Sequence, residues 1–395
     1  MEHSSSNGEL HSVSPTSMAE SVTRHAQITE DEEFKFLLSG IDSLDLGLFV
    51  AWGRDWEQHL QDLDRKKLEA QTQNGLLSEM PSGKKYIFKP GGKGSTYRFH
   101  LEFPNYHLYI SKNPAITATP NVFVSLRAKT IWFQQMKSIV NEISTDLRAI
   151  VGGSIQRVQP SRCDLAVDFL IPGGLSFDFL NSHKVTRSRK STPYFDGNTL
   201  ETLYIGAKGA KVLLRLYDKA KEVLTQGKKL WFKELWKVDR IANVWRVEFQ
   251  IRLSVLKQYG VNTLEDLQCK SGGIWKDLTE KWFSLRIADN ESTDRRTTHP
   301  FWEQVQQCAA QFGPAMTVNR NLVGTNDTSI EWHLSHIGGC LSSFAARLGI
   351  DNRQDALRAF EAQLLNHMSE RTFRKQYEKK AISLGRSILS KRAPR

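Results

Sequence analysis

The chain has little cysteine and no long apolar run. Its four cysteines, Cys163, Cys269, Cys308 and Cys340, form no Cys-x-x-Cys pair, so neither a zinc knuckle nor a redox dithiol is visible. Few, separated cysteines fit a reducing cytoplasm. No apolar run reaches about 18 residues, and the first residues, MEHSSSNGEL, lack the basic and apolar parts of a signal peptide. We therefore expect a cytoplasmic protein with no membrane span.

Positive charge is what the sequence has in excess. The 395 residues include 54 Lys and Arg against 43 Asp and Glu, which gives a formal net charge of +11. Hydrophobic residues make up 39% and charged residues 25%, as in folded globular proteins. A cationic surface favours polyanions, and nucleic acid is the usual one. The composition predicts a folded protein with nucleic acid as its first candidate partner.

Changes in composition and periodicity divide the chain into four parts. Residues 1–32 are rich in Ser, Thr, Glu and His, which predicts a flexible segment. Residues 33–255 interleave helical spacing with short alternating segments, which predicts an α+β domain whose antiparallel sheet is flanked by helices. Residues 256–370 have mainly helical spacing, including 274–287, and 371–395 form a basic tail. The helical region is expected to serve DNA recognition or dimerisation, so a homodimer is one option.

Three of the predicted strands have one apolar and one polar face. Side chains two residues apart on a strand share a face. The three segments are RCDLAVDF at 162–169, LLRLYDK at 213–219 and WRVEFQIR at 245–252. If these strands are neighbours in one sheet, their polar faces bring together acidic, basic and phenolic groups. The converging residues are Arg162, Asp164, Asp168, Arg215, Tyr217, Lys219, Arg246 and Glu248.

This composition suits chemistry on a phosphate. Carboxylates drawn together repel unless a cation lies among them, and oxygen ligands suit Mg²⁺ or Mn²⁺, so Asp164, Asp168 and Glu248 are candidate metal ligands. The metal and the basic side chains would stabilise charge on the phosphate while Tyr217 attacks phosphorus. Cationic neighbours that favour the phenolate would make Tyr217 a better nucleophile. Alternatively, each polar face is simply the solvent face of a sheet.

At these residues the chain resembles the replication initiation factor family, which includes rolling-circle plasmid and filamentous-phage initiators and relaxases of integrative elements. The family carries an R-x-D-x-x-x-D-F strand, a Y-x-G-x-x-x-S-x-x-x-R-x-Y-D-K block and an R-x-E strand in this order. The matching segments are RCDLAVDF, YIGAKGAKVLLRLYDKAKE and WRVEFQIR, within about residues 80–255. One departure is the sequence Gly206-AKGAK, which lacks the serine of the family block.

The resemblance implies a metal-dependent DNA nicking and closing enzyme that works at a replication origin. Tyr217 matches the nucleophile, which would form a 5′-phosphotyrosyl link and later rejoin the strand. The cofactor would be Mg²⁺ or Mn²⁺, and the partner origin DNA in single-stranded, extruded or supercoiled form. The basic positions of the family match Arg162, Arg215, Lys219 and Arg246, and the acidic positions match Asp164, Asp168 and Glu248.

Two basic segments are candidates for contacts with the DNA backbone. HKVTRSRK at 183–190 is a basic loop punctuated by Ser and Thr, and the turn at 206–211 carries two lysines. The sequence GGKGST at 91–96 lacks the spacing of a P-loop, so unwinding is expected to need a host helicase. The candidate DNA-binding residues are Lys184, Arg187, Arg189, Lys190, Lys208 and Lys211.

Two other functions stay open at this point. One is a non-catalytic initiator or regulator that binds an origin without cutting it. The other is a metal-dependent hydrolytic nuclease in which Tyr217 only packs. All three share a basic surface, so charge does not separate them, whereas a protein–DNA adduct that survives denaturation does.

Overall fold

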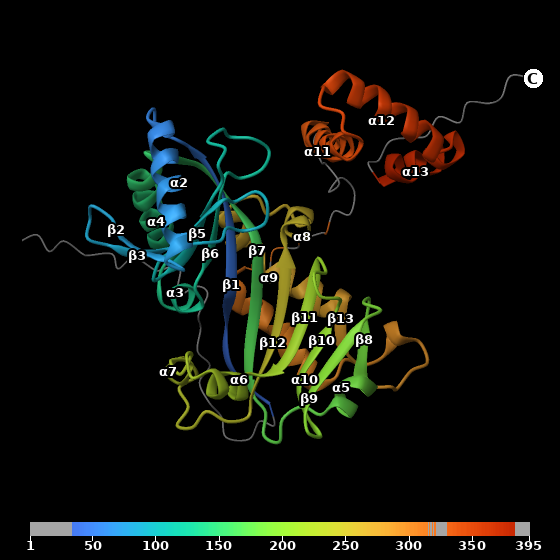
Figure 1. Ribbon diagram of the computed structural model, residues 1–395. Helices are drawn as coiled ribbons and strands as arrows, with labels where there is room; N and C mark the ends of the chain where they lie inside the picture. The colour runs from blue at the N-terminus through green and yellow to red at the C-terminus, as the bar shows by residue number, and fades with distance from the viewer. Residues whose placement is uncertain (1–33, 315, 317, 319, 321–329, 384–395) are drawn as a thin grey trace, which may run out of the picture.

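The computed structural model describes residues 34–314, 316, 318, 320 and 330–383. The segment 1–32 and the last twelve residues of the basic tail, 384–395, lie outside the described residues. The described chain has the expected α+β architecture, in which helices flank one large antiparallel sheet (Figure 1). No helix in the described ranges combines the length and the apolar character that a membrane crossing requires.

The large sheet has 11 strands in the order β2-β3-β4-β5-β6-β1-β7-β12-β11-β10-β9. In sheet order, the strands are β2 (Leu76–Glu79), β3 (Lys85–Lys89), β4 (Phe99–Glu102), β5 (Tyr106–Ile110), β6 (Val122–Leu126), β1 (Lys35–Ala51), β7 (Ser154–Leu170), β12 (Val244–Arg252), β11 (Val212–Asp218), β10 (Thr199–Ile205) and β9 (Ser191–Asp196). A second sheet pairs β8 (Lys184–Thr186) with β13 (Phe283–Leu285).

Strands β1 and β7 are the two long central strands of the sheet. Each has 17 residues, and they join the β2–β6 half to the β9–β12 half (Figure 1). Their pairing shifts register at four places, including Ile41/Ser43 and Asp45/Leu46. Such bulges bend a strand and increase its twist. The β2–β6 half and the β9–β12 half therefore belong to one sheet, although the bends in β1 and β7 turn the strands of one half away from those of the other.

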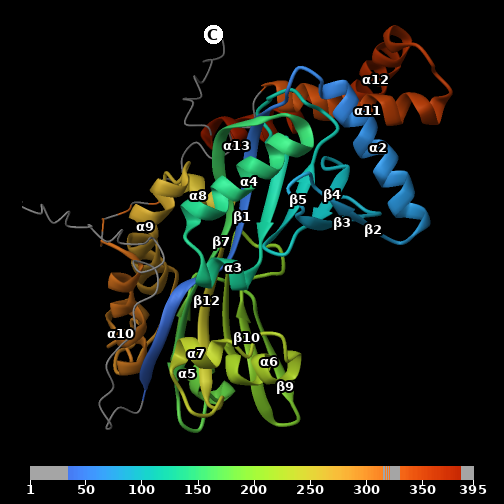
Figure 2. The ribbon, with the colours of Figure 1, turned by 90° about the vertical axis from the view of Figure 1, so that its left-hand side faces the viewer.

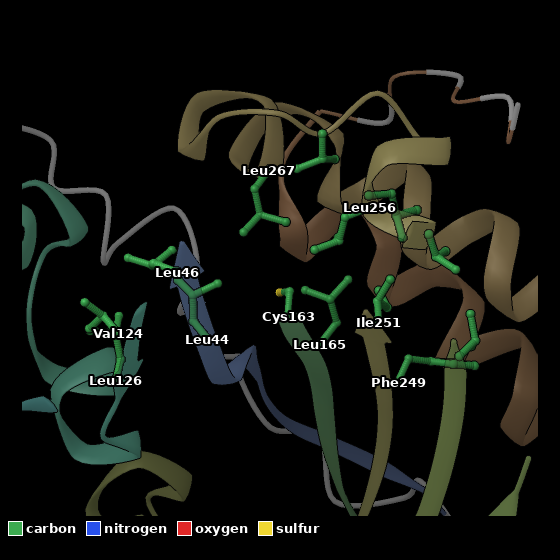
Figure 3. Packing of buried hydrophobic residues seen from close by; sticks show 14 of the residues in the cluster. Leu44, Leu46, Val124, Leu126, Cys163, Leu165, Phe249, Ile251, Leu256 and Leu267 are labelled. Carbon is green, nitrogen blue, oxygen red and sulfur yellow. The ribbon is translucent and has the colours of Figure 1, made fainter. Parts of the chain in front are cut away.

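One face of this sheet carries the main core. Helices α2 (Trp56–Thr72), α4 (Met136–Val151), α8 (Leu253–Gln258), α9 (Leu264–Asp277) and α10 (Pro300–Gln307) contribute to it. Figure 2 shows α8, α9 and α10 together on one side of the long strands. In Figure 3, Leu256 and Leu267 lie over Cys163 and Ile251 of the sheet. The boundary expected at residue 255 therefore does not separate two cores, because α8–α10 share the core of the sheet.

The opposite face is partly covered by α3 (Ala128–Phe133), α6 (Lys219–Gln226) and α7 (Phe232–Trp236). Trp132, Phe232 and Trp236 form an aromatic cluster there, with ring centroids 5.6 and 5.1 Å apart. Gly40 of β1 lies beneath this cluster, and a Cβ atom at that position would approach Trp132 to 2.6 Å. A side chain at residue 40 would push α3 off the sheet.

The remaining helices are α5 (Phe177–His183), α11 (Ile330–Leu348), α12 (Arg353–His367) and α13 (Glu370–Ser383). Helices α11 and α12 pack on each other, with the rings of Phe344 and Phe360 5.4 Å apart in an edge-to-face arrangement. Several apolar side chains of α12 and α13 are exposed, including Leu357, Leu365 and Phe373.

Candidate functional site

The three strands with polar faces are direct neighbours, in the order β7-β12-β11. Their register places Arg215 opposite Glu248 and Tyr217 opposite Arg246, and Arg246 in turn opposite Asp168. The apolar faces of the same strands pack into the main core. The acidic, basic and phenolic side chains therefore converge on one side of the sheet, as their alternation predicts.

Tyr217 lies at the centre of this group. Its hydroxyl Oη donates a hydrogen bond to Glu248 Oε2 over 2.9 Å, and Lys219 Nζ donates to the same Oη over 3.3 Å. The phenol is half-buried and lines an open cleft of about 370 Å³ between β10, β11 and α6, together with Tyr204 and Arg215. The tyrosine that the sequence marks as the candidate nucleophile thus lines a cleft that is open to solvent.

The local sequence explains this placement. Strand β11 ends at Asp218, whose side chain accepts a hydrogen bond of 2.8 Å from the backbone N–H of Lys221 and so caps α6. The strand therefore changes into a helix one residue after Tyr217. Lys219, in the first turn of α6, is directed back under the phenol, where it is fully buried and paired with Glu222.

Arginine side chains neutralise the carboxylates of Glu248 and Asp164. Arg215 pairs with Glu248 and, over 2.8 Å, with Asp164 Oδ2. Arg162 holds both oxygens of Asp164, with its Nε 2.8 Å from Oδ1. Arg162 and Arg215 remain partly exposed, whereas Asp164 and Glu248 are buried. Guanidinium groups thus form the solvent side of this part of the site.

Burial shifts the acid–base balance of the site. Burial, reinforced by the negative charge of Asp42, raises the pKa of Glu248 from 4.5 to about 7. Burial and the Glu248 charge raise the pKa of the Tyr217 phenol well above its usual value. Burial, with the charge of Arg246, lowers the pKa of Lys219. These directions favour a neutral Tyr217 phenol over the expected phenolate and place it beside a carboxylate of raised pKa.

Asp168 and Arg246 belong to a second, sealed network. Arg246 Nε donates to Asp168 Oδ1 over 2.6 Å, and Trp236 Nε1 donates to Asp168 Oδ2 over 2.7 Å. Arg246 also pairs with Asp42, which accepts a hydrogen bond of 3.4 Å from Trp132. Arg246 and Asp168 are 0% and 1% exposed, so neither side chain is open to a substrate phosphate. They instead hold α3 and α7 on the sheet through the two tryptophans.

Asp42 is the member of the site that sequence reasoning missed. It lies on β1, at the register shift between Ile41 and Ser43. The signal available in the sequence was a carboxylate inside a long, mostly apolar segment, because such a charge needs a buried partner. That partner is Arg246, more than 200 residues away along the chain.

The three expected metal ligands do not form a metal site in this arrangement. Each oxygen of Asp164, Asp168 and Glu248 accepts a hydrogen bond from an arginine, a tryptophan or Tyr217. In the described part of the chain, no group of three or more His, Cys, Asp or Glu is placed to hold a metal ion. The donor set fits guanidinium groups and does not fit a divalent cation.

The expected DNA-binding residues lie at one end of the β9–β12 half. Lys208 and Lys211 are exposed in the turn between β10 and β11, and the Lys190 carbonyl accepts a 2.8 Å hydrogen bond from the Gly206 N–H of that turn. Arg187 and Arg189 are exposed just before β9, whereas Lys184 is half-buried and bonded to Asn181 over 2.6 Å. Six residues of extended chain separate Lys211 from Tyr217, which places their Cα atoms about 20 Å apart along β11.

Comparison with solved structures finds a likeness to a replication initiator protein. The structure is similar to that of a rolling-circle replication initiator protein from Geobacillus stearothermophilus, with 17% sequence identity and a TM-score of 0.40. The match covers 72% of this chain and 99% of that chain. No family model matches the chain. No curated protein matches it either. At this identity and TM-score the likeness defines no activity.

Proposed function

We propose that this chain cuts one strand of DNA through Tyr217 and stays covalently attached to the cut end, as a rolling-circle initiator or relaxase does. The observation that carries the proposal is the hydrogen bond between Tyr217 Oη and Glu248 Oε2 on the wall of an open cleft. A phenol that faces solvent space on one side and a carboxylate on the other has the geometry of an activated nucleophile.

The proposed step is an in-line displacement at phosphorus. Tyr217 Oη forms the new bond to phosphorus while its proton passes to Glu248 over 2.9 Å. The bond from phosphorus to the 3′ oxygen breaks, and water in the open cleft supplies the proton that makes this oxygen a hydroxyl. The 5′ phosphate remains on Tyr217 as a phosphodiester, which can be reversed by attack of a 3′-OH. Attachment to the 5′ side follows from the family resemblance.

The basic side chains have separate tasks in this step. Arg215 lines the cleft beside Tyr217, where its charge would stabilise the pentavalent phosphorus and its oxygens. Lys219 cannot reach a substrate, because it is buried, but its ammonium group donates to Oη and favours charge on that atom as the proton leaves. Arg246 acts only through the packing of α3 and α7.

A denaturing gel with doubly labelled DNA tests this proposal. The protein is incubated with a library of single-stranded oligonucleotides that carry one dye on the 5′ end and another on the 3′ end. We expect the 3′ dye to migrate with the protein and the 5′ dye to be released. Tyr217→Phe should abolish the adduct, whereas Tyr204→Phe, in the same cleft, should retain it.

The other outcomes identify the alternative functions. Cleavage with both dyes on free fragments would mean a hydrolytic nuclease, and binding without cleavage would mean a non-catalytic initiator or regulator. An adduct of undiminished yield in Tyr217→Phe would overturn the assignment of the nucleophile.

A further inference from the structure

A row of aromatic side chains crosses the β2–β6 half of the sheet. His100 on β4 is opposite Tyr109 on β5, and Tyr109 is opposite Phe123 on β6. The His100 and Tyr109 rings are stacked, with centroids 4.3 Å apart and planes at 22°. All three rings are partly exposed, while the residues before and after them on each strand are buried in the main core. We call these three side chains the aromatic row.

Cationic groups border the aromatic row. Lys93, in the connection between β3 and β4, has its ammonium 4.9 Å from the Tyr109 ring centroid and 4.1 Å from that of Phe123. Lys89 on β3 is opposite His100, and Lys89 and Arg127 share Glu102 as an ionic partner. Asp45 is a second carboxylate near Lys93 and Tyr109, so three cations stand against two carboxylates, and the remaining positive charge favours a polyanion.

His100 and His107, the two histidines of this surface, are neutral aromatic rings at neutral pH. Burial, together with the neighbouring His107, lowers the pKa of His100 to about 4. Burial also lowers the pKa of His107, whose Nδ1 lies 3.0 Å from His100 Nε2. A neutral imidazole stacked on a phenol extends a π surface, which suits a flat ligand.

The same face of the sheet continues to Tyr217. A second row of paired residues runs from His107 through Ser125 and Asp45 to Arg162 on β7. Arg162 holds Asp164, and Asp164 pairs with Arg215 beside the nucleophile. Five strand spacings separate β5 from β11, or about 24 Å at about 4.8 Å for each spacing. Along β7, Phe123 is level with Gln159 and Tyr217 is level with Asp168, which are nine residues or about 30 Å apart at about 3.3 Å per residue. The path across the sheet from the aromatic row to Tyr217 is therefore roughly 38 Å, the length of several nucleotides of extended single-stranded DNA.

We propose that the aromatic row is a binding subsite for unpaired nucleotides of the DNA strand that Tyr217 cuts. Bases stack on Tyr109, Phe123 and His100, and the sugar-phosphate backbone follows Lys93 and Arg127 toward Arg162. Stacking of this kind is independent of sequence, because every base has a π face. Duplex DNA hides its bases, so the subsite distinguishes single strands from duplex. The subsite rests on the proposed function and deepens it by assigning where the strand is held several nucleotides from the cut.

Equilibrium binding to the full chain tests this subsite apart from catalysis. All proteins carry Tyr217→Phe, so that no adduct contributes, and the probe is fluorescein-labelled oligothymidylate followed by fluorescence anisotropy. Tyr109→Ala should raise the Kd about tenfold, which corresponds to the loss of one stacked base. Tyr109→Phe is the matched control, and it should bind as the parent does because it retains the ring. Binding of a duplex of mixed sequence should be the same in all three proteins.

A second measurement keeps the proposal testable if Tyr109→Ala lowers the melting temperature. Oligonucleotides containing bromodeoxyuridine are photo-crosslinked to the unmutated chain, and the attached peptides are identified by mass spectrometry. We expect crosslinks in β4, β5 and β6. Equal Kd values for Tyr109→Ala and Tyr109→Phe, or crosslinks confined to residues 184–211, would overturn the subsite. So would an equal weakening of duplex binding. None of these three results would affect the adduct on Tyr217, which is measured separately.

Discussion

The hydroxyl of Tyr217 and the carboxylate of Glu248 share a hydrogen bond of 2.9 Å across neighbouring strands of one sheet. The strand pairing itself sets this distance, because Tyr217 lies two residues beyond Arg215, the direct cross-strand partner of Glu248. A pair fixed by backbone register needs no loop movement to form. Burial raises the pKa of the phenol, which keeps its proton in place in the resting state, and raises the pKa of Glu248, which makes the carboxylate a stronger proton acceptor.

Replacing Glu248 by Gln tests its role as the proton acceptor. The amide keeps the size of the side chain but cannot accept a proton, so we expect the rate of adduct formation to fall by about 10²-fold or more. DNA binding should remain within a factor of about three, because Glu248 is buried and contacts no solvent. Single-turnover kinetics give the rate. Glu201→Gln, which changes a carboxylate in the same cleft, should leave it nearly unchanged.

The pH dependence of the unmutated protein follows from the same assignment. A base works in its ionised form, and the Glu248 pKa is about 7. The single-turnover rate should therefore rise with pH below about 7 and level off above it. A rate that is flat from pH 5 to pH 9 would contradict the assignment of Glu248.

Stability should respond to pH in the opposite direction. The pKa of Glu248 is higher in the folded chain than its usual 4.5, so the folded state favours the protonated form. Its contribution to stability is fully present below pH 4.5 and is lost as the pH rises to about 7. Residue 248 does not titrate in Glu248→Gln. As the pH rises over this range, the free energy of unfolding of the parent should therefore fall by up to about 3 kcal/mol relative to that of the variant.

Denaturant unfolding at several pH values measures this difference. Glu57→Gln, an exposed carboxylate change on α2, is the control and should show no such trend. If the difference between Glu248→Gln and the parent stays constant with pH, burial does not raise the pKa of Glu248.

Metal binding at this site should depend on Arg215. Its guanidinium occupies the position between Asp164 and Glu248 that a cation would take. Removing it as Arg215→Gln leaves two buried carboxylates uncompensated, so we expect the variant to bind Mn²⁺ more tightly than the unmutated chain does. Electron paramagnetic resonance of free Mn²⁺ measures the affinity. Tight binding by the unmutated chain that Asp164→Asn abolishes would restore the three-carboxylate metal site expected from the sequence.

Asp42 should matter for stability through Arg246. Asp42→Asn removes one of the two carboxylates that neutralise a fully buried guanidinium, which we expect to cost about 3 kcal/mol of unfolding free energy. Asp45→Asn is the matched control on the same strand, because Asp45 is only half-buried and should cost less than about 1 kcal/mol. Urea denaturation compares the two. Equal costs would mean that the Arg246 network is not a stabilising unit.

Alternation along single strands predicted much of the site, because a strand keeps its two faces wherever it lies. The rule placed Arg215, Tyr217 and Glu248 on the polar faces of their strands, and the neighbouring positions of β7, β12 and β11 bring these faces together. The rule does not say how charges pair once they meet, so the same carboxylates were expected to bind a metal and instead bind arginines. Register also remained hidden, since Asp42 reaches Arg246 only because β1 and β7 pair along their whole length.

Helical spacing was a weaker guide. The segment 274–287 has helical periodicity, but Phe283–Leu285 forms β13 because it pairs with β8. The strand partner that decides the structure of this segment lies about 100 residues away in the sequence, where helical spacing cannot indicate it.

Peptide mapping of the protein–DNA adduct tests the central assignment most directly. Tyr217 lies in the tryptic peptide Leu216-Tyr-Asp-Lys, because trypsin cleaves after Arg215 and Lys219. After nuclease digestion of the bound DNA, we expect this peptide to carry the mass of a 5′-phosphorylated nucleotide on Tyr217. A nucleotide on any other residue, or none on this peptide despite a stable adduct, would contradict the account.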